Sequence, residues 1–252
     1  MILMHKTALL TVTHDPTGNN CESFIEYKSL LQDLYEDLFI AVSNETSPDL
    51  IKLLEESQFK VKIIPKRGAA HARRKAVEWG LTSQMDYYHY CDFDRILTWS
   101  RYYPEELGTI ISNISAHDYT IIGRTERAFK THPVEWVETE KITNRICSLE
   151  LGKQVDITAG SCAFSRQAAG YINQYSEAKM TDAEWAMIIH RIAQFNLGYI
   201  AAEGLEYHEE INGVSKNISQ TEKWIQRLEL SLIISKSARD TVAGACVNQT
   251  FD

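Results

Sequence analysis

Hydrophobic and polar positions follow one another in a regular order along the first half of the chain. Short β-prone apolar runs, closed by polar or turn-forming residues, predict strands over residues 7–13, 38–42, 59–64 and 87–91. Between these runs, apolar residues recur at helical spacing and predict helices over residues 23–38, 49–57 and 69–81. Strands that alternate with helices indicate an α/β fold with a mostly parallel sheet flanked by helices.

The second half of the chain has a less regular pattern. It predicts strands over residues 119–123 and 198–201, helices over 139–151, 181–196 and 221–238, and a strand with a loop over 156–166. No internal repeat or low-complexity linker interrupts the sequence. We therefore expect one domain over residues 1–220, followed by a C-terminal helix and tail over 221–252. The apolar spacing of that helix indicates packing against the domain, with a homodimer contact as the alternative.

Composition narrows the classes of function. The 252 residues are 44% hydrophobic and 24% charged, which is typical of a folded globular protein. A net charge of −8 argues against nucleic-acid binding, because phosphate neutralisation needs clustered cations. Five cysteines without a C-x-x-C pair argue against a zinc knuckle and favour the reducing cytoplasm. No stretch reaches the roughly 18 apolar residues of a membrane span, so we expect no transmembrane segment.

Two carboxylates follow the fourth predicted strand directly. Asp92 and Asp94 are separated by one residue, so at a strand end both can point to the same side. Ligands of parallel sheets bind at the carboxyl ends of the strands. Paired carboxylates at that place suit Mg²⁺ or Mn²⁺, which prefer oxygen ligands and often keep bonds to substrate phosphates. The alternative is a solvated loop in which the two acids cap a turn.

A basic segment follows the third predicted strand. Residues 66–75 hold five Lys or Arg residues in an otherwise acidic chain. Gly68 permits a tight turn before the helix, and the N-terminus of a helix attracts anions. Arginine side chains bind phosphate oxygens through two parallel hydrogen bonds. The segment favours a bound diphosphate, and a solvated basic helix face is the alternative interpretation.

Four segments resemble, in order, the motifs of glycosyltransferases of GT-A fold, especially the large family that includes polysaccharide synthases and mannosylglycerate synthase. The first two are residues 68–74, similar to the family's G-x-x-x-A-R-N segment, and 90–94, similar to its D-x-D strand. The other two are residues 160–166, similar to its G-x-x-x-x-F-x-R segment, and 181–184 with 198–200, similar to its E-D-x-D helix and G-Y strand. The resemblance spans roughly the first 200 residues.

This resemblance implies a metal-dependent transfer of a sugar from a UDP- or GDP-sugar to the hydroxyl of a carbohydrate or small acceptor. It implies a nucleotide-binding half over about residues 1–100 and an acceptor-binding half over about 101–220. It implies Mn²⁺ or Mg²⁺ as the cofactor, with Asp92 and Asp94 as ligands. His208 is either a third ligand or an ordinary surface histidine. The expected nucleotide-contacting residues are Thr13, His14, Glu45, Arg67, Arg73, Asp92 and Phe93.

On the acceptor side, the resemblance places Asp182 at the position of a catalytic aspartate, which removes the proton of the acceptor hydroxyl. Thr181 and Glu184 also fit a capping box around it. The expected acceptor-binding residues are Trp136, Gly160, Ser161 and Tyr207. Two rivals remain, a sugar-phosphate nucleotidyltransferase and a non-catalytic nucleotide-sugar-binding or partner-docking relative. The chain lacks the glycine-rich segment that nucleotidyltransferases usually carry after the first strand.

Overall fold

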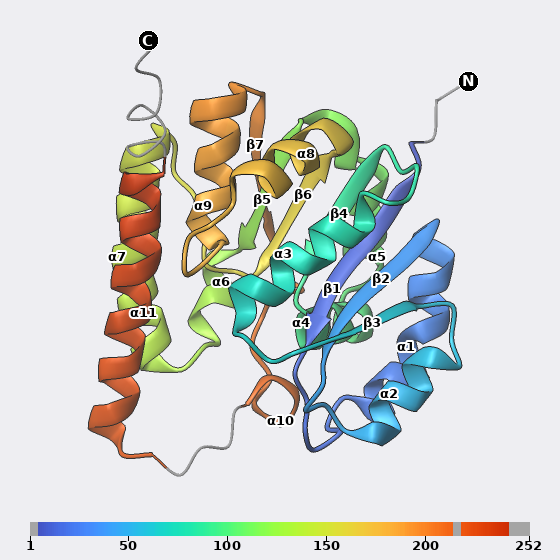
Figure 1. The fold of residues 1–252 in the computed structure, drawn as a ribbon. Helices are drawn as coiled ribbons and strands as arrows, with labels where there is room; N and C mark the ends of the chain where they lie inside the picture. Colours follow the sequence, from blue (N-terminus) through green and yellow to red (C-terminus); the bar gives the residue numbers. More distant parts are fainter. Residues whose placement is uncertain (1–4, 214–217, 242–252) are drawn as a thin grey trace.

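The computed structural model describes residues 5–213 and 218–241, so Cys246 and most of the predicted tail lie outside the described part. A seven-stranded sheet crosses the molecule, with helices on both faces (Figure 1). In chain order its strands are β1 (Thr7–Thr13), β2 (Asp37–Ser43), β3 (Lys60–Ile64), β4 (Tyr87–Cys91), β5 (Tyr119–Arg124), β6 (Ser161–Ser165) and β7 (Leu197–Ala202).

The strand order across the sheet is β3-β2-β1-β4-β6-β5-β7. Strands β1 to β4 run parallel to one another, and β5 is parallel to β7. β6 runs antiparallel to both β4 and β5, between the two parallel groups. The predicted mostly parallel sheet is therefore confirmed, and β6 is its one antiparallel strand among the described residues.

Strands β1 and β2 carry apolar residues in succession because both of their faces are covered. Leu9 and Leu10 of β1 are both fully buried, but they belong to different hydrophobic clusters. Phe39 of β2 packs in the cluster of Leu10, and Ile40 packs in the cluster of Leu9. Successive side chains of a strand point to opposite faces, so each strand contributes to a core on either side of the sheet.

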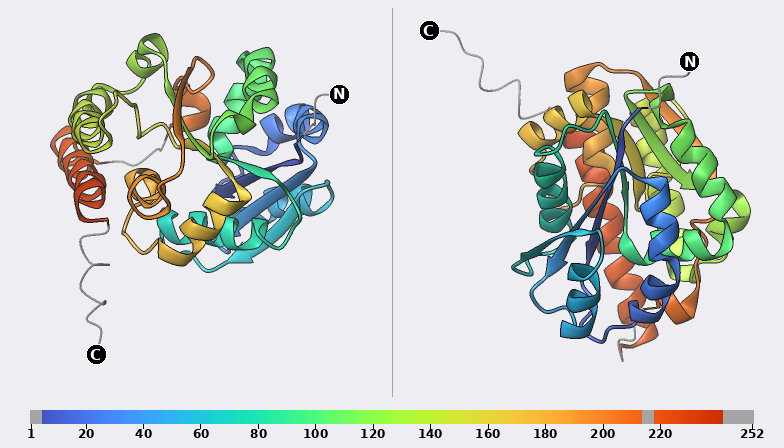
Figure 2. Two further views of the ribbon diagram at one scale, coloured as in Figure 1. Left: turned by 90° about the horizontal axis from the view of Figure 1, so that it is seen from above. Right: turned by 90° about the vertical axis from the view of Figure 1, so that its right-hand side faces the viewer.

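The helices divide between these two cores. One face of the sheet is covered by α1 (Cys21–Leu34), α2 (Pro48–Glu55), α4 (Phe93–Tyr102) and α5 (Pro104–Ser112). The other is covered by α3 (Ala69–Gly80), α7 (Val134–Leu151), α8 (Arg166–Tyr175), α9 (Asp182–Met187) and α11 (Gln220–Asp240). Three short helices, η1 (Ile114–Ala116), α6 (Glu126–Lys130) and α10 (Glu209–Asn212), lie in connecting segments. Figure 2 shows the two layers from above and from the side.

Several elements of the structure differ from the sequence pattern. The pattern does not predict α4, α5 or α8, and it begins α7 five residues too late. The predicted helix over residues 181–196 is α-helical only to Met187 and continues as a π-helix, η2 (Ile188–Ala193). That segment ends at Gln194, whose φ of 53° lies in the left-handed region. A change of helix type within one apolar run leaves no mark in the spacing of hydrophobic residues.

The closing helix α11 packs against α7 and α9, as predicted (Figure 1). Ser231 of α11 and Thr143 of α7 share a buried hydrogen bond of 2.7 Å, while Ile234 and Ala238 enter the core. None of the described helices combines the length and apolar content that a membrane span requires. The described part of α11 is thus a wall of the domain, although the boundary at residue 220 stays a prediction.

Candidate functional site

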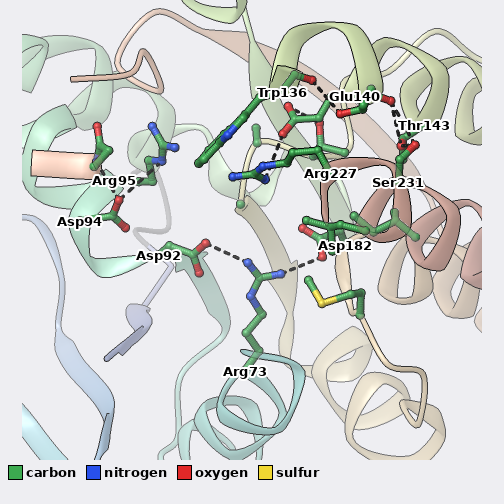
Figure 3. A pocket seen from close by; sticks show the side chains of 18 residues that line it. Arg73, Asp92, Asp94, Arg95, Trp136, Glu140, Thr143, Asp182, Arg227 and Ser231 are labelled. Atoms are coloured by element: carbon green, nitrogen blue, oxygen red, sulfur yellow. Dashed lines mark hydrogen bonds and ion pairs between the residues drawn. The ribbon is translucent and has the colours of Figure 1, made fainter. Parts of the chain in front are cut away.

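A cavity of about 250 Å³ lies between the carboxyl end of β4 and the helices α7, α9 and α11 (Figure 3). It collects charged side chains that are far apart in the sequence. Those that line it are Arg73, Asp92, Asp94, Arg95, Glu140, Asp182 and Arg227, together with Trp136, Thr143 and Ser231. The sequence predicted a site at this edge of the sheet because strands expose their carboxyl ends there.

Asp92 is fixed by three neighbours at the end of β4. Its backbone N–H donates to the carbonyl of Gly160, at 3.2 Å. Its carboxylate accepts hydrogen bonds from the hydroxyl of Tyr90 and, at 2.8 Å, from Arg73. Gly160 has a φ of 74°, and a Cβ at that residue would lie 2.7 Å from Oδ2 of Asp92. A glycine is needed here both for the backbone conformation and for the space that Asp92 occupies.

Arg73 of α3 joins Asp92 to Asp182. One guanidinium nitrogen contacts Asp92, and the other donates to Asp182 at 2.9 Å and to the hydroxyl of Thr181 at 3.2 Å (Figure 3). The side chain is 8% exposed. Burial disfavours its charge, but Asp182 and Asp92 outweigh that cost and hold the pKa of Arg73 well above its usual range. This buried arginine therefore fixes the distance between the two sides of the cavity.

Asp94 lies in the first turn of α4 and has no close cation of its own among the described residues. Its nearest guanidinium nitrogen is Nε of Arg95, at 3.8 Å, and the amide of Asn212 donates to Oδ2 at 2.7 Å. Burial raises the pKa of Asp94, and Arg95 only partly opposes that rise. A half-buried, incompletely neutralised carboxylate that lines a cavity beside Asp92 provides oxygen donors of the kind Mn²⁺ and Mg²⁺ prefer.

His208 is held beside this pair of acids rather than within it. Its Nε2 lies 2.8 Å from Glu206, and its ring stacks on Tyr102 with the ring centres 4.1 Å apart. Its backbone N–H donates to Asn212, whose amide holds Asp94. Within residues 5–213 and 218–241, no three His, Cys, Asp or Glu side chains are arranged as a metal site. The role of His208 as a third ligand stays a prediction.

The residues predicted to contact the nucleotide lie along the same edge of the sheet. The Nδ1 atom of His14 is 3.2 Å from the hydroxyl of Ser43, and Glu45 forms an exposed ion pair of 2.7 Å with Lys66. Thr13 is half-buried at the end of β1, and Arg67 is exposed before α3. These side chains surround the ends of β1, β2 and β3 and do not line the cavity of Figure 3.

Phe93 requires a correction. The resemblance implied a contact with the nucleotide, but its side chain is 1% exposed and packs against Phe24 and Phe59 in the core. The reason is that α4 begins at residue 93, directly after β4, and its first turn directs the ring toward α1. Asp92 and Asp94, on either side of Phe93, reach the cavity, while the ring of Phe93 anchors this segment in the core.

The predicted acceptor-binding residues divide into two groups. Trp136 and Tyr207 form an aromatic pair with ring centres 5.6 Å apart, and Trp136 lines the cavity together with Gly160. Ser161 lies within β6, and its hydroxyl is 3.0 Å from Nε2 of His89, inside the sheet. The structure thus brings Trp136, Tyr207 and Gly160 to the region of the cavity, whereas the side chain of Ser161 is engaged elsewhere.

The predicted capping box at the start of α9 is wrong. Thr181 makes no side-chain cap bond, because its hydroxyl accepts a hydrogen bond from Arg73. Glu184 turns away from the helix start and accepts the backbone N–H groups of Glu177 and Ala178 at 2.6 and 2.5 Å. Thr181 therefore holds the segment that carries Asp182 through a contact with distant Arg73, and Glu184 holds it through the loop just before α9, instead of a local cap.

Comparison with known proteins identifies the type of this fold. Neither the scan against models of protein families nor the search of curated protein sequences found a match. Among solved structures, glucosyl-3-phosphoglycerate synthase from Mycobacterium tuberculosis with UDP aligns over 93% of this chain and 80% of that chain, with a TM-score of 0.59 and 13% identity. The same protein with Mn²⁺, UDP-glucose and phosphoglyceric acid has a TM-score of 0.57, with the same identity and coverage. The fold is of GT-A type.

Within this GT-A fold, the site includes Arg95, Asn212 and Arg227, which the sequence pattern did not predict. Arg95 follows the D-x-D segment directly, Asn212 holds Asp94, and Arg227 enters the cavity from α11. The first and last left a signal in the sequence. Arg95 is adjacent to the two acids, and Arg227 is spaced three and seven residues before the apolar positions Leu230 and Ile234, which places all three on one face of α11. Asn212 left none, because its contact depends on a short helix far along the chain.

Proposed function

We propose that this chain is a metal-dependent glycosyltransferase that transfers a sugar from a UDP- or GDP-sugar to the hydroxyl group of an acceptor. The observation that carries the proposal is the position of Asp92 and Asp94 at the carboxyl end of β4, in one cavity with Asp182. The GT-A fold supports it, since the similar solved structures hold UDP with Mn²⁺ or Mg²⁺. Fold likeness at 13% identity would not carry the proposal without these residues.

Asp94, with Asp92 beside it, would hold the metal ion. The carboxylate of Asp94 is half-buried, its nearest guanidinium nitrogen among the described residues is 3.8 Å away, and a positive charge in the cavity would stabilise it. When bound, Mn²⁺ or Mg²⁺ supplies Lewis-acid stabilisation of the charge on the departing diphosphate, worth several kcal/mol. The amide of Asn212 orients the carboxylate of Asp94 for this task.

Asp182 would act as the general base toward the acceptor. Arg73 binds its Oδ2 atom, which fixes the carboxylate and leaves Oδ1 to accept the proton of the acceptor hydroxyl. The same arginine binds Asp92, so one guanidinium fixes the position of the donor-side carboxylate relative to the acceptor-side carboxylate. On the donor side, Thr13, His14, Glu45 and Arg67 would bind the nucleotide from the loops that follow β1, β2 and β3.

Thermal-shift measurements with UDP and GDP, each with and without Mn²⁺, test the donor side of this proposal. Because a ligand that binds only the native state adds RT ln(1 + [L]/Kd) to its stability, one nucleotide should raise the melting temperature, and the rise should depend on the metal. Turnover of the matching nucleotide sugar with Mn²⁺ then separates an enzyme from a non-catalytic binding protein. A protein that responds to neither nucleotide, with or without metal, is not the proposed transferase.

A further inference from the structure

Exposed apolar side chains are concentrated on α7 and α11, two helices that pack against each other at one edge of the molecule (Figure 2). In the part of the chain that the structure describes, ten large hydrophobic side chains are exposed, and six of them belong to these two helices. On α11 they are Ile225, Leu228 and Leu232, and on α7 they include Ile142 and Leu149. Single exposed apolar residues are normal, but a cluster of them marks an interaction surface.

The three exposed residues of α11 form one stripe along the helix. Ile225, Leu228 and Leu232 are 44%, 50% and 54% exposed and recur at intervals of three and four residues, which places them on one face. None of the three lines the cavity of Figure 3, which α11 reaches with Arg227 and Ser231. Between residues 220 and 230, no side chain of α11 is buried. The α11 stripe is therefore uncovered within one copy of the chain.

Charged residues follow the α11 stripe along one flank. Glu222, Glu229 and Lys236 are exposed and recur at intervals of seven residues. The ion pairs that α11 forms within the described part of the chain use Arg227 and Arg239 instead. In the packing of two helices, apolar residues at this spacing form the contact, and charges on the flank select the partner and its direction.

The α11 stripe fits a second copy of itself when the two helices run antiparallel. A two-fold axis close to Leu228 sets Ile225 of one copy against Leu232 of the other, since the two lie at nearly equal distances from it in sequence. The same axis sets Glu222 of one copy against Lys236 of the other. Parallel helices would instead place each of these charges opposite its own copy, so the charge pattern favours the antiparallel arrangement.

We propose that this chain forms a symmetric dimer in which the α11 stripes of two copies pack antiparallel. The inference does not depend on the proposed sugar transfer, because the stripe is separate from the cavity. The exposed side chains of Ile142 and Leu149 enlarge the apolar surface on the neighbouring helix. The axis also brings Glu229 near its own copy, and like charges weaken such a contact. The dimer therefore dissociates on dilution, and Glu229→Gln should strengthen it.

Sedimentation equilibrium at a series of protein concentrations tests the dimer. Leu228→Glu places two like charges at the axis and should raise the dissociation constant about 100-fold or more. Ile63→Glu is the matched control, because Ile63 of the edge strand β3 is also 50% exposed. This control should dimerise like the wild type, and the melting temperature of each variant shows whether it is folded.

An exchange of charges tests the antiparallel pairing. Glu222→Lys and Lys236→Glu each turn two attractive contacts into repulsive ones and should raise the dissociation constant about 10-fold. The double variant should return it to near the wild-type value. Within one copy the two residues are about 21 Å apart along the helix, so only a contact between copies explains this recovery. If Leu228→Glu does not fold, the charge exchange decides the question alone.

Three results would overturn the inference. They are a wild-type chain that is still monomeric at about 1 mM, a dimer that Leu228→Glu leaves unchanged, and a double charge variant without recovery. Vesicles of phosphatidylcholine, with and without phosphatidylglycerol, test a lipid surface as the other occupant. A monomeric chain that binds these vesicles, and loses that binding in Leu228→Glu, uses the α11 stripe for a membrane surface, and the dimer is then wrong.

Discussion

The two walls of the cavity are built in different ways. On the β4 side, Asp92 and Asp94 come from one short segment whose position is set by the ends of parallel strands and by the start of α4. On the facing side, Asp182, Trp136 and Arg227 come from α9, α7 and α11, three helices that are far apart in the sequence. The first wall depends on backbone geometry, and the second depends on how helices pack.

Because the walls are built differently, substitutions on one wall should have different effects from substitutions on the other. Changes on the β4 wall should reduce metal and nucleotide binding and thereby affect every acceptor alike. Changes on the helical wall should leave the nucleotide in place and alter the proton transfer or the choice of acceptor. Arg73 and Gly160 lie where the walls meet, because Arg73 binds an acid of each wall and Gly160 contacts Asp92.

The largest effect is expected from Asp94→Asn on the β4 wall. The substitution keeps the shape of the side chain and removes the charge that binds the metal, so kcat/KM should fall roughly 1,000-fold or more, equivalent to ~4 kcal/mol of transition-state stabilisation. The metal-dependent part of the thermal shift by UDP or GDP should vanish as well. Steady-state kinetics and thermal shift measure both effects, with Asp33→Asn, an exposed acid of α1, as the control. Wild-type activity in Asp94→Asn would refute the metal site.

The next effect is expected from Asp182→Asn on the helical wall. An asparagine can still accept the hydrogen bond of Arg73 but cannot take a proton, so kcat should fall roughly 100- to 10,000-fold. Nucleotide binding should change by no more than a few-fold, in contrast to Asp94→Asn. Parallel measurement of kcat and of the nucleotide Kd checks this split. Equal losses in both quantities would mean that the two walls do not act separately.

The β4 wall could be predicted from the sequence, because each of its features has a local cause. The strand pattern of residues 87–91 places Asp92 and Asp94 at a sheet edge, and Gly68 with Arg73 marks the helix that follows β3. The prediction for Phe93 was wrong on this wall. The direction of its side chain depends on the helix that starts at that residue, which the spacing of the two acids does not reveal.

The helical wall could be predicted only in part. Trp136 and Asp182 were identified as single residues, but the contacts that hold them are between distant segments. The Arg73 bridge to Asp182 joins residues 109 positions apart, and Asn212 lies 118 positions from Asp94. No periodicity of hydrophobic residues encodes such contacts, since they arise only when α7, α9, α10 and α11 pack.

A smaller effect is expected at the junction of the walls, from Gly160→Ala. Gly152 and Gly160 both have positive φ angles, 67° and 74°, so alanine at either position should cost roughly 1–2 kcal/mol of stability. A Cβ at Gly152 meets no atom within 4 Å, whereas at Gly160 it would displace the carboxylate of Asp92. Activity should therefore fall about 10- to 100-fold in Gly160→Ala and remain near wild type in Gly152→Ala. Similar activity in the two variants would show that the close approach of Gly160 to Asp92 is not needed for activity.

The smallest effect concerns the stability of the same junction at low pH. Burial lowers the pKa of His89 to about 3. Its two ring nitrogens lie 2.7 Å from the hydroxyl of Tyr35 and 3.0 Å from the hydroxyl of Ser161, the residue that follows Gly160. An imidazole that is neutral when folded but protonates below pH 6.5 when unfolded stabilises the native state above that pH. This contribution is lost as the pH falls from 6.5 toward 3.

Between pH 7.5 and pH 5, His89 alone should account for about 2 kcal/mol of the lost unfolding free energy, since each pH unit below 6.5 costs about 1.4 kcal/mol. His89→Gln should be less stable than wild type at pH 7.5, because its hydrogen bonds fit less well, but its stability should depend less on pH. Urea unfolding at a series of pH values measures the slope, with the exposed His190→Gln as the control. If the pH dependence of the unfolding free energy is the same in His89→Gln as in wild type, the imidazole does not stay neutral between β4 and β6. The two walls would then not be joined by a hydrogen bond of a neutral His89.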